Sequence, residues 1–273
     1  MIGPDGQLSP GPGGRLARVP WWLLALGLAA AIFACRVATS AVYGEILAAL
    51  LAGLTVTLAV TAVTFPLAIG LGLLTALGLV SPHPFRRNVA LLYVQVARGV
   101  PILVQILIAA FVLVPLGIDA LHALGGGQGA LGALRSSDVP MGVRVVAALA
   151  FAYGAFEAET IRGGLTSLAR GQAEAARAVG LSQRQALRHV LLPQTFGRIL
   201  PTLGNDLISL LKDSSLVSVL GVRDITQEAR LYASANFRYT ESLTLLAFFY
   251  LALTLLLALL VRGLEARYRR HAA

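Results

Sequence analysis

Few residues of this chain have the types and spacing that catalysis needs. The single lysine, Lys212, follows Ile-Ser-Leu-Leu and so lacks the glycines of a phosphate-binding P-loop. The four histidines fall in loops or polar ends, so none could serve as the buried base of an intramembrane serine protease; they are His83, His122, His189 and His271. Histidines and carboxylates also lack metal-ligand spacing. We therefore expect a protein that is not an enzyme and that binds no metal or cofactor itself.

Polar side chains inside apolar stretches form a second set of candidates. Such groups are costly in hydrocarbon and usually face the interior of a helix bundle or a water-filled path. The candidates for a substrate pathway or gate are Arg98, Glu159, Asn205, Lys212, Asp213, Ser214 and Ser215. Structural alternatives stay open, because Glu159 can form an interfacial ion pair with Arg162 and Lys212 can neutralise Asp213. Arg98 is expected to cap or pair at the cytosolic rim.

A polar, arginine-rich segment between two apolar stretches is built like a docking element. Residues 172–179 suit a short alanine-rich helix, and Gly180 can adopt the left-handed conformation that ends it. Ser182 and Gln185 form a capping box, which predicts a second helix, and Pro193 is expected to end that helix. We call residues 170–193 the docking segment. It is predicted to be two short helices with a fixed bend that face the cytosol and receive a soluble partner.

The elements that must position these residues are apolar helices. Hydrophobic residues make up 57% of the chain, charged residues make up 13%, and mean hydropathy is +0.77, which is typical of a membrane protein. A transmembrane helix needs roughly 20 apolar residues. The qualifying stretches are 20–38, 46–80, 89–116, 139–161, 199–222 and 243–261, with a break in the third at residues 98–101. We therefore predict an all-α polytopic membrane protein.

Two features predict how these helices pack. Threonines at helical spacing in the second stretch, Thr57, Thr61 and Thr64, are expected to hydrogen-bond to neighbouring helices, with a polar pathway as the alternative. The fourth stretch is rich in alanine and glycine, and small residues let helix backbones approach closely. We expect that helix in the middle of the bundle.

The arginines predict the orientation. The net charge of +9 does not point to nucleic acid, because most arginines outside the apolar stretches share one side with the docking segment. The positive-inside rule then makes that side cytosolic, together with both termini. Residues 1–19, rich in glycine and proline, are expected to be a disordered cytosolic tail. The first stretch, 20–38, also resembles a signal peptide, and cleavage near Ser40 is the alternative to a retained helix.

Four motifs resemble those of permease subunits of binding-protein-dependent ABC importers, specifically the polar amino-acid group. The first reads Glu174-Ala175-Ala176, then Gly180 after three residues, then Val190-Leu191-Leu192-Pro193 after nine more, with valine where the family has isoleucine. The others are 98–105 (RGVPILVQ), 159–164 (ETIRGG) and 211–218 (LKDSSLVS). Val100 and Ser214 stand where the family usually has threonine. The resemblance covers roughly residues 45–267.

The resemblance implies a type I ABC-importer permease fold with five core transmembrane helices and one extra N-terminal helix at 20–38. It implies a multi-pass protein of the bacterial inner membrane in which two permease subunits, alike or different, form a pathway for an amino acid. A dimer of ABC ATPase subunits would bind ATP and Mg, and an extracytoplasmic solute-binding protein would deliver the substrate. The residues implied in coupling to the ATPase are Glu174, Ala175, Ala176, Gly180, Leu192 and Pro193.

Other functions remain compatible with the residues. An ABC importer for another small solute would carry the same docking segment. An ion-coupled carrier or channel without an ATPase would suit Lys212 and Asp213, but it leaves the docking segment unexplained. A membrane scaffold that binds a soluble partner would tolerate loss of the intramembrane polar groups, whereas a transporter should not.

Overall fold

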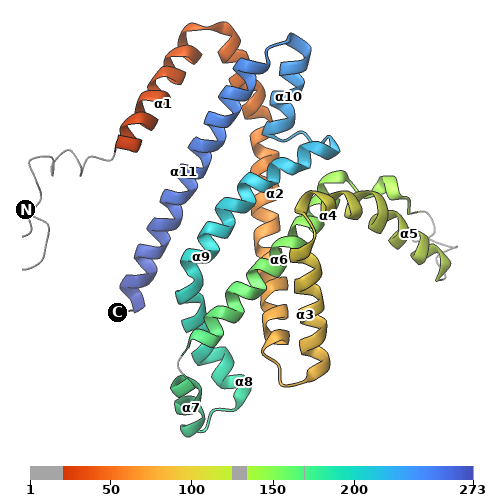
Figure 1. Ribbon diagram of the computed structural model, residues 1–273, viewed down its shortest axis with the longest axis vertical. Helices are drawn as coiled ribbons and strands as arrows, with labels where there is room; N and C mark the ends of the chain where they lie inside the picture. The colour runs from red at the N-terminus through yellow and green to blue at the C-terminus, as the bar shows by residue number, and fades with distance from the viewer. Residues whose placement is uncertain (1–20, 125–133, 169, 273) are drawn as a thin grey trace, which may run out of the picture.

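Figure 1 shows an all-helical chain in which α2 runs along the long axis of the molecule. The computed structural model describes residues 21–124, 134–168 and 170–272, so the tail predicted at 1–19 lies outside the described residues. The elements in order are α1 (Trp21–Thr39), α2 (Ala41–Leu79), α3 (Pro84–Gly99), α4 (Ile102–Ile108), a π-helix η3 (Ala109–Leu113), α5 (Val114–Ala123), a 3₁₀ turn η4 (Ser136–Asp138), α6 (Met141–Ser167), α7 (Arg170–Ala178), α8 (Gln183–Ala186), a π-helix η5 (Leu187–Leu191), α9 (Leu192–Asp213), a 3₁₀-helix η6 (Ser214–Leu220), α10 (Ile225–Asn236) and α11 (Tyr239–Ala272).

The centre of the bundle is the contact between α2 and α6. The two helices approach closely where Gly72 faces Glu157, since a Cβ on Gly72 would lie 2.5 Å from the Glu157 Cβ. Val60 and Ala68 of α2 pack against Val145 and other core residues of α6. Of the four membrane-length helices, α6 is the most buried, since 61% of its most apolar 18-residue stretch lies inside the protein. The prediction that the alanine-rich helix lies in the middle is therefore confirmed.

Four helical segments are long and apolar enough to cross a membrane. They are Ala41–Leu79, Ile102–Ala123, Met141–Ser167 and Tyr239–Arg267, while α1 has a shorter apolar helix at Leu24–Thr39. The stretch predicted at 199–222 does not form one apolar helix. It belongs to α9, which begins in the docking segment and ends at Asp213, and to the 3₁₀-helix η6. The charges of Asp206, Lys212 and Asp213 make it less apolar than the four.

The third apolar stretch is broken, as its sequence predicts. Val100 is extended (φ −103°, ψ 132°) because the ring of Pro101 crowds a helical conformation at the preceding residue. The side chain of Gln105 spans the break, with Nε2 donating to the carbonyl oxygens of Ala97 at 2.7 Å and Val100 at 2.8 Å. These two bonds satisfy backbone acceptors that the broken helix leaves free. The helix α3 before the break is consequently a separate element from α4.

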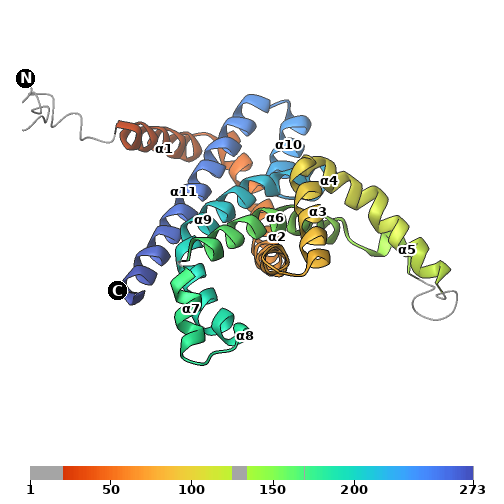
Figure 2. The same cartoon turned by 60° about the horizontal axis from the view of Figure 1, so that its bottom comes forward.

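One threonine of the predicted stripe, Thr57, fastens α2 to α10. Thr57 Oγ1 accepts a hydrogen bond from the backbone N–H of Ile225 at 3.2 Å, where α10 begins. Gly53 allows this approach, because a Cβ there would lie 2.5 Å from the Asp224 carbonyl carbon. Thr57 therefore confirms the predicted interhelical role, whereas Thr61 bonds back to the Thr57 carbonyl within its own helix. At the other end of the molecule, α7 and α8 project beyond the bundle (Figures 1 and 2).

Candidate functional site

The bend of the docking segment is a Schellman motif. The backbone N–H of Leu181 donates to the Ala176 carbonyl at 3.1 Å, which is the bond that defines the motif. The N–H of Val179 makes the last regular helical bond before it, to the Ala175 carbonyl at 3.2 Å. Gly180, between Val179 and Leu181, has φ +85°, the left-handed region that glycine adopts without a Cβ penalty. The short helix α7, its end at Gly180 and the left-handed conformation were all predicted from the sequence, and all three are confirmed.

The second helix begins with the predicted capping box. The backbone N–H of Gln185 donates to Ser182 Oγ at 3.3 Å, and the N–H of Ser182 donates to Gln185 Oε1 at 2.9 Å. Its predicted end at Pro193 is wrong. The π-helix η5 carries the chain directly from α8 into α9, and Pro193 lies in the first turn of α9. Proline inside a continuous helical run removes one backbone hydrogen bond, and the π-helix η5 directly before it is where the hydrogen-bond pattern of the run changes.

The outward surface of the docking segment is made by a few exposed residues. Glu174 and Ala175 are exposed, and Val179 is 77% exposed. Ala176 is only 5% exposed. Of the two alanines in the motif, Ala175 is thus available to a partner, while Ala176 packs inside the segment. Leu192 is half-buried.

Two hydrogen bonds fasten the base of the docking segment to the bundle. Arg198 Nη1 donates to the Ser167 carbonyl at 2.9 Å, joining α9 to the end of α6. Gln194 Nε2 donates to Gln172 Oε1 at 3.4 Å, joining α9 to α7. The segment is therefore held from both of the membrane-depth helices that flank it.

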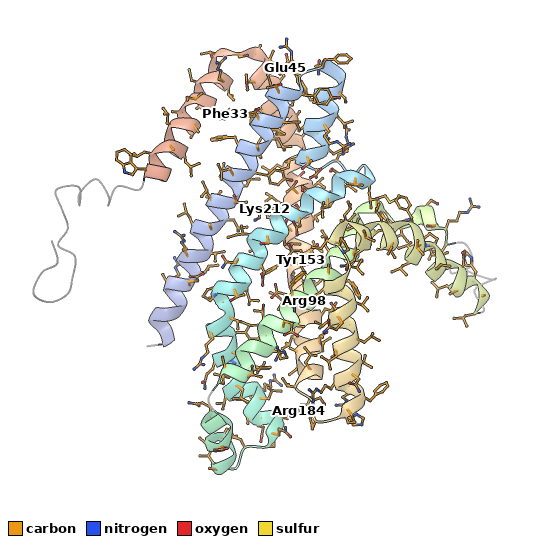
Figure 3. All side chains as sticks on the ribbon, in the orientation of Figure 1. Phe33, Glu45, Arg98, Tyr153, Arg184 and Lys212 are labelled. Atoms are coloured by element: carbon orange, nitrogen blue, oxygen red, sulfur yellow. The ribbon has the colours of Figure 1, made fainter. Side chains whose placement is uncertain are left out.

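Among the polar candidates at membrane depth, Asp213 contacts Tyr153 of α6. The Tyr153 hydroxyl donates to Asp213 Oδ2 at 2.8 Å, which joins α6 to α9. Ser214 Oγ donates to the Leu211 carbonyl at 2.7 Å and is buried. Lys212 is exposed and forms no ion pair within the described part of the chain, so it does not neutralise Asp213 (Figure 3). Asn205 is also exposed, and Ser215 is half-buried.

Arg98 lies at the end of α3 that is remote from the turn between α2 and α3. It occupies the last turn of α3, and a 16-residue helix of roughly 24 Å separates it from the turn between α2 and α3. The guanidinium carbon lies 5.6 Å from the ring centroid of Phe156 in α6. Phe156 is in turn 5.9 Å from the Tyr153 ring. Arg98 therefore belongs to the Tyr153 cluster, which Figure 3 places at mid-height.

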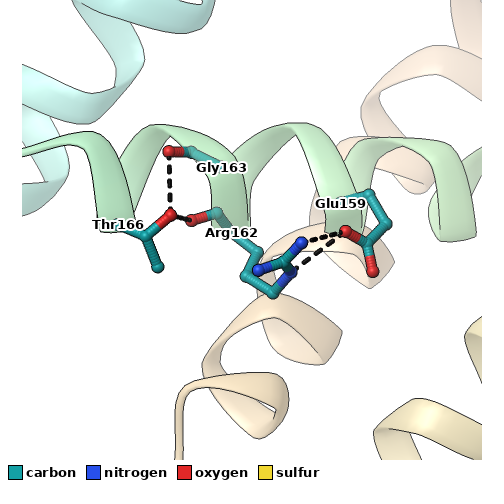
Figure 4. A network of polar contacts seen from close by, with 4 residues as sticks. All are labelled: Glu159, Arg162, Gly163 and Thr166. Carbon is teal, nitrogen blue, oxygen red and sulfur yellow. Dashed lines mark hydrogen bonds and ion pairs between the residues drawn. The ribbon is translucent and has the colours of Figure 1, made fainter.

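Glu159 and Arg162 form the ion pair that their spacing predicts. Arg162 Nη2 and Nε donate to Glu159 Oε2 at 2.6 and 3.0 Å (Figure 4). Both side chains are partly exposed, Arg162 by 41% and Glu159 by 27%. The pair lies one to three helical turns toward the docking segment from Tyr153.

Two further carboxylates lie in this region, Glu157 and Asp206, which the sequence also places inside apolar stretches. Glu157 is completely buried, and neither of its oxygens has a hydrogen-bond partner in the described chain. Asp206 of α9 interacts with it electrostatically and has one buried oxygen without a partner. Sequence reasoning missed Tyr153 and Phe156. Their sequence signal is weak, since they are two of three aromatic residues, with Phe151, in a helix rich in alanine and glycine.

Comparisons with known proteins agree with this arrangement. Residues 68–270 match the family described as "Binding-protein-dependent transport system inner membrane component". The chain is 35% identical over 182 residues to the glutamine transport system permease protein GlnP of Escherichia coli (strain K12), covering 67% of this chain and 75% of the relative. It is 32% identical over 228 residues to the L-cystine transport system permease protein TcyL of Bacillus subtilis (strain 168), covering 84% and 90%.

Solved structures give the same fold. A crystal structure of an amino acid ABC transporter with histidines matches with a TM-score of 0.64 at 33% identity, covering 82% of this chain and 95% of that chain. An inward-facing structure of the MetNI methionine ABC transporter matches with a TM-score of 0.57 at 20% identity, covering 84% and 98%. The predicted type I ABC-importer permease fold is thereby confirmed, and this chain belongs to the family of inner-membrane components of binding-protein-dependent transport systems.

Proposed function

We propose that this chain is the permease subunit of an ATP-driven importer that moves a polar amino acid delivered by an extracytoplasmic binding protein. The names of its relatives support the substrate class, since they are permeases for glutamine and cystine. The observation that carries the proposal is the docking segment. A bent helix pair with an exposed Val179 and Glu174 projects from one end of the bundle, which suits a groove on a soluble ATPase.

At its C-terminal end, the docking segment continues into the membrane region as helix, with no loop between them. Because α8, η5 and α9 form one continuous helical run, a movement of the segment is passed to Asp206 and Asp213. ATP-driven closure of the ATPase dimer would in this way alternate access to the pathway by rigid-body movement. ATP and Mg belong to the ATPase in this scheme, and this chain supplies no ligand for them.

A photo-crosslinking amino acid at Val179 tests the docking role. In membranes that contain the complete transporter, we expect position 179 to capture a P-loop ATPase, identified by mass spectrometry. Phe237 is the matched control, because it is 87% exposed and lies at the far end of the molecule, after α10. Equal capture of the ATPase from both positions, or none from position 179, would contradict the assignment.

A transport assay also tests the docking segment. Glu174→Lys should leave the protein in the membrane and reduce ATP-driven amino-acid uptake, because it reverses the charge on the exposed face of α7. An ion-coupled carrier without an ATPase would be unaffected by this change. Normal ATP-dependent uptake by the variant would therefore remove the docking segment from the mechanism.

The exposed polar residues at membrane depth, Arg98, Asn205 and Lys212, would face the pathway. Exposed charges at membrane depth are costly against lipid, so a second permease subunit is expected to cover them. A photo-crosslinking amino acid in place of Asn205 should crosslink across that contact to whichever permease lies there. The mass of the product would distinguish two copies of this chain from a pair with a related permease.

The orientation follows from the docking role and the arginine distribution. The end that carries α7 and α8 is cytosolic, and both chain termini are cytosolic if the first helix is retained. Terminal sequencing of the mature protein tests this, because a new N-terminus near position 41 would place it outside.

A further inference from the structure

A groove runs between α2 and α3 on the side of these helices that the rest of the chain leaves open. It encloses about 510 Å³ and is lined once per helical turn, by Leu71, Leu74 and Gly78 of α2 and by Arg86, Val89 and Tyr93 of α3. The helices are closest at its floor, where a Cβ on Gly78 would lie 3.0 Å from the Ala90 Cβ. The lining is mainly apolar, and its one charged residue, Arg86, lies at one end.

The groove opens to the surroundings of the bundle and not to its core. Val94 and Ala97 of α3 pack on Ala155 and Ala158 of α6, so that face of α3 is occupied. In contrast, Leu74 and Phe85 along the groove are each 70% exposed. Tyr93 closes the far end, because its hydroxyl donates to the Phe151 carbonyl at 2.6 Å. In a chain that spans a membrane, an apolar groove of this kind faces lipid.

The open end of the groove carries two adjacent positive charges. Arg86 lines the mouth and Arg87 follows it, and both are exposed at the end of the molecule that also carries α7 and α8. Neither arginine forms an ion pair with another residue that the structure describes. The sequence from Ser81 to Leu92 contains no acidic residue. An anion is therefore the missing complement at this end of an apolar channel.

We propose that this groove binds one anionic phospholipid, with an acyl chain along the floor between α2 and α3 and the phosphate at Arg86 and Arg87. The combination of an apolar groove and a basic mouth matches the two parts of such a lipid. A basic side chain near a membrane surface favours an anionic lipid by about fivefold. The guanidinium group also binds phosphate oxygens with charge-assisted hydrogen bonds.

Tryptophan fluorescence tests the proposal directly. Phe85→Trp, with Trp21→Phe and Trp22→Phe, puts the only tryptophan at the mouth of the groove. The full chain is reconstituted into phosphatidylcholine vesicles in which a rising fraction of the lipid is brominated phosphatidylglycerol or brominated phosphatidylcholine. We expect the brominated anionic lipid to quench at lower mole fraction, by about fivefold or more.

Two variants distinguish the contribution of the arginine charges from that of the apolar groove. Arg86→Gln with Arg87→Gln should remove the preference and leave quenching by both lipids equal. The matched control, Arg36→Gln with Arg230→Gln, removes the same charge elsewhere and should keep the preference. Val89→Phe, which fills the groove, should weaken quenching by both lipids.

Three results would overturn the proposal. Equal quenching by the two lipids in the parent would mean that the groove is filled by lipid without selection. A preference that survives Arg86→Gln with Arg87→Gln would place the anion elsewhere. Absence of quenching by either lipid would mean that a protein surface, such as a second copy of the chain, covers the groove.

Discussion

The docking segment and the contact between α2 and α6 are held together in different ways. The α2–α6 contact depends on side chains far apart in sequence, with Gly72 against Glu157 and Val60 near Val145. The docking segment depends on backbone motifs that each lie within six residues, at Gly180 and Ser182. Its outer residues, including Val179, are exposed and do not pack against the rest of the described chain. Long-range packing in the membrane core therefore determines the fold of the bundle. Local backbone motifs determine only the shape of the docking segment, whose exposed side is left for a partner.

The difference has a consequence for mutations. Changes at the α2–α6 contact should lower the amount of folded protein, because they force apart two central helices. Changes at the bend should leave the bundle intact and affect only its use. Four substitutions test this division, in order of expected effect on stability.

Gly72→Leu should have the largest effect. A Cβ at this position would lie 2.5 Å from the Glu157 Cβ and 3.0 Å from the Ala158 backbone nitrogen, so one helix must move. We expect a loss of about 3 kcal/mol or more, seen as aggregation in detergent during size-exclusion chromatography and as a lower melting temperature. Gly70→Ala is the control, because nothing lies within 4 Å of a Cβ there; a similar loss from that change would contradict the packing argument.

Tyr153→Phe should cost about 2 kcal/mol, because Asp213 loses a hydrogen bond at a charged acceptor. A double-mutant cycle with Asp213→Asn should show coupling between the two residues in thermal unfolding. Tyr93→Phe is the matched control, since it removes a hydrogen bond to a neutral backbone carbonyl. We expect uptake to fall in Tyr153→Phe and to persist in Tyr93→Phe. Equal uptake by the two variants would separate Tyr153 from the pathway.

Gly180→Ala should strain the bend by about 1–2 kcal/mol, because φ is +85° there. No atom lies within 4 Å of the added Cβ, so the effect comes from the backbone alone. The melting temperature of the bundle should hardly change, while ATP-driven uptake should fall. Gly171→Ala, also in open space but without positive φ, should keep normal uptake. A lower melting temperature with normal uptake would reverse the roles given to the two regions.

Arg162→Gln should have the smallest effect, below about 1 kcal/mol, since the Glu159 pair is partly exposed. The difference in melting temperature from the parent should shrink as salt is raised. A loss larger than that of Tyr153→Phe would show that the pair is a structural element of the bundle.

Sequence reasoning succeeded where the determinants are local. The bend at Gly180, the capping box at Ser182, the break before Pro101 and the Glu159–Arg162 pair each depend on residues a few positions apart. Propensity and capping rules act at that range. The small-residue helix was also placed correctly, since close packing needs only a low side-chain volume.

It failed where a helix continues or where partners come from another element. Pro193 does not end its helix, because the π-helix η5 before it shifts the hydrogen-bond pattern and leaves proline in the first turn of α9. The contacts of Arg98 with Phe156 and of Tyr153 with Asp213 require α3, α6 and α9 to be positioned first. The spacing of residues along the sequence gives no information about such contacts between different helices.

The continuous run from α8 through η5 into α9 acts as a lever. From Gln183 to Asp213 it spans roughly 45 Å, so a small tilt at the end beside α7 becomes a displacement of several ångströms at the other. The π-helix η5 (Leu187–Leu191) lies near the start of this run, directly after α8, and long helices kink at such elements. The angle fixed there would set the direction in which a displacement of α7 moves Asp213.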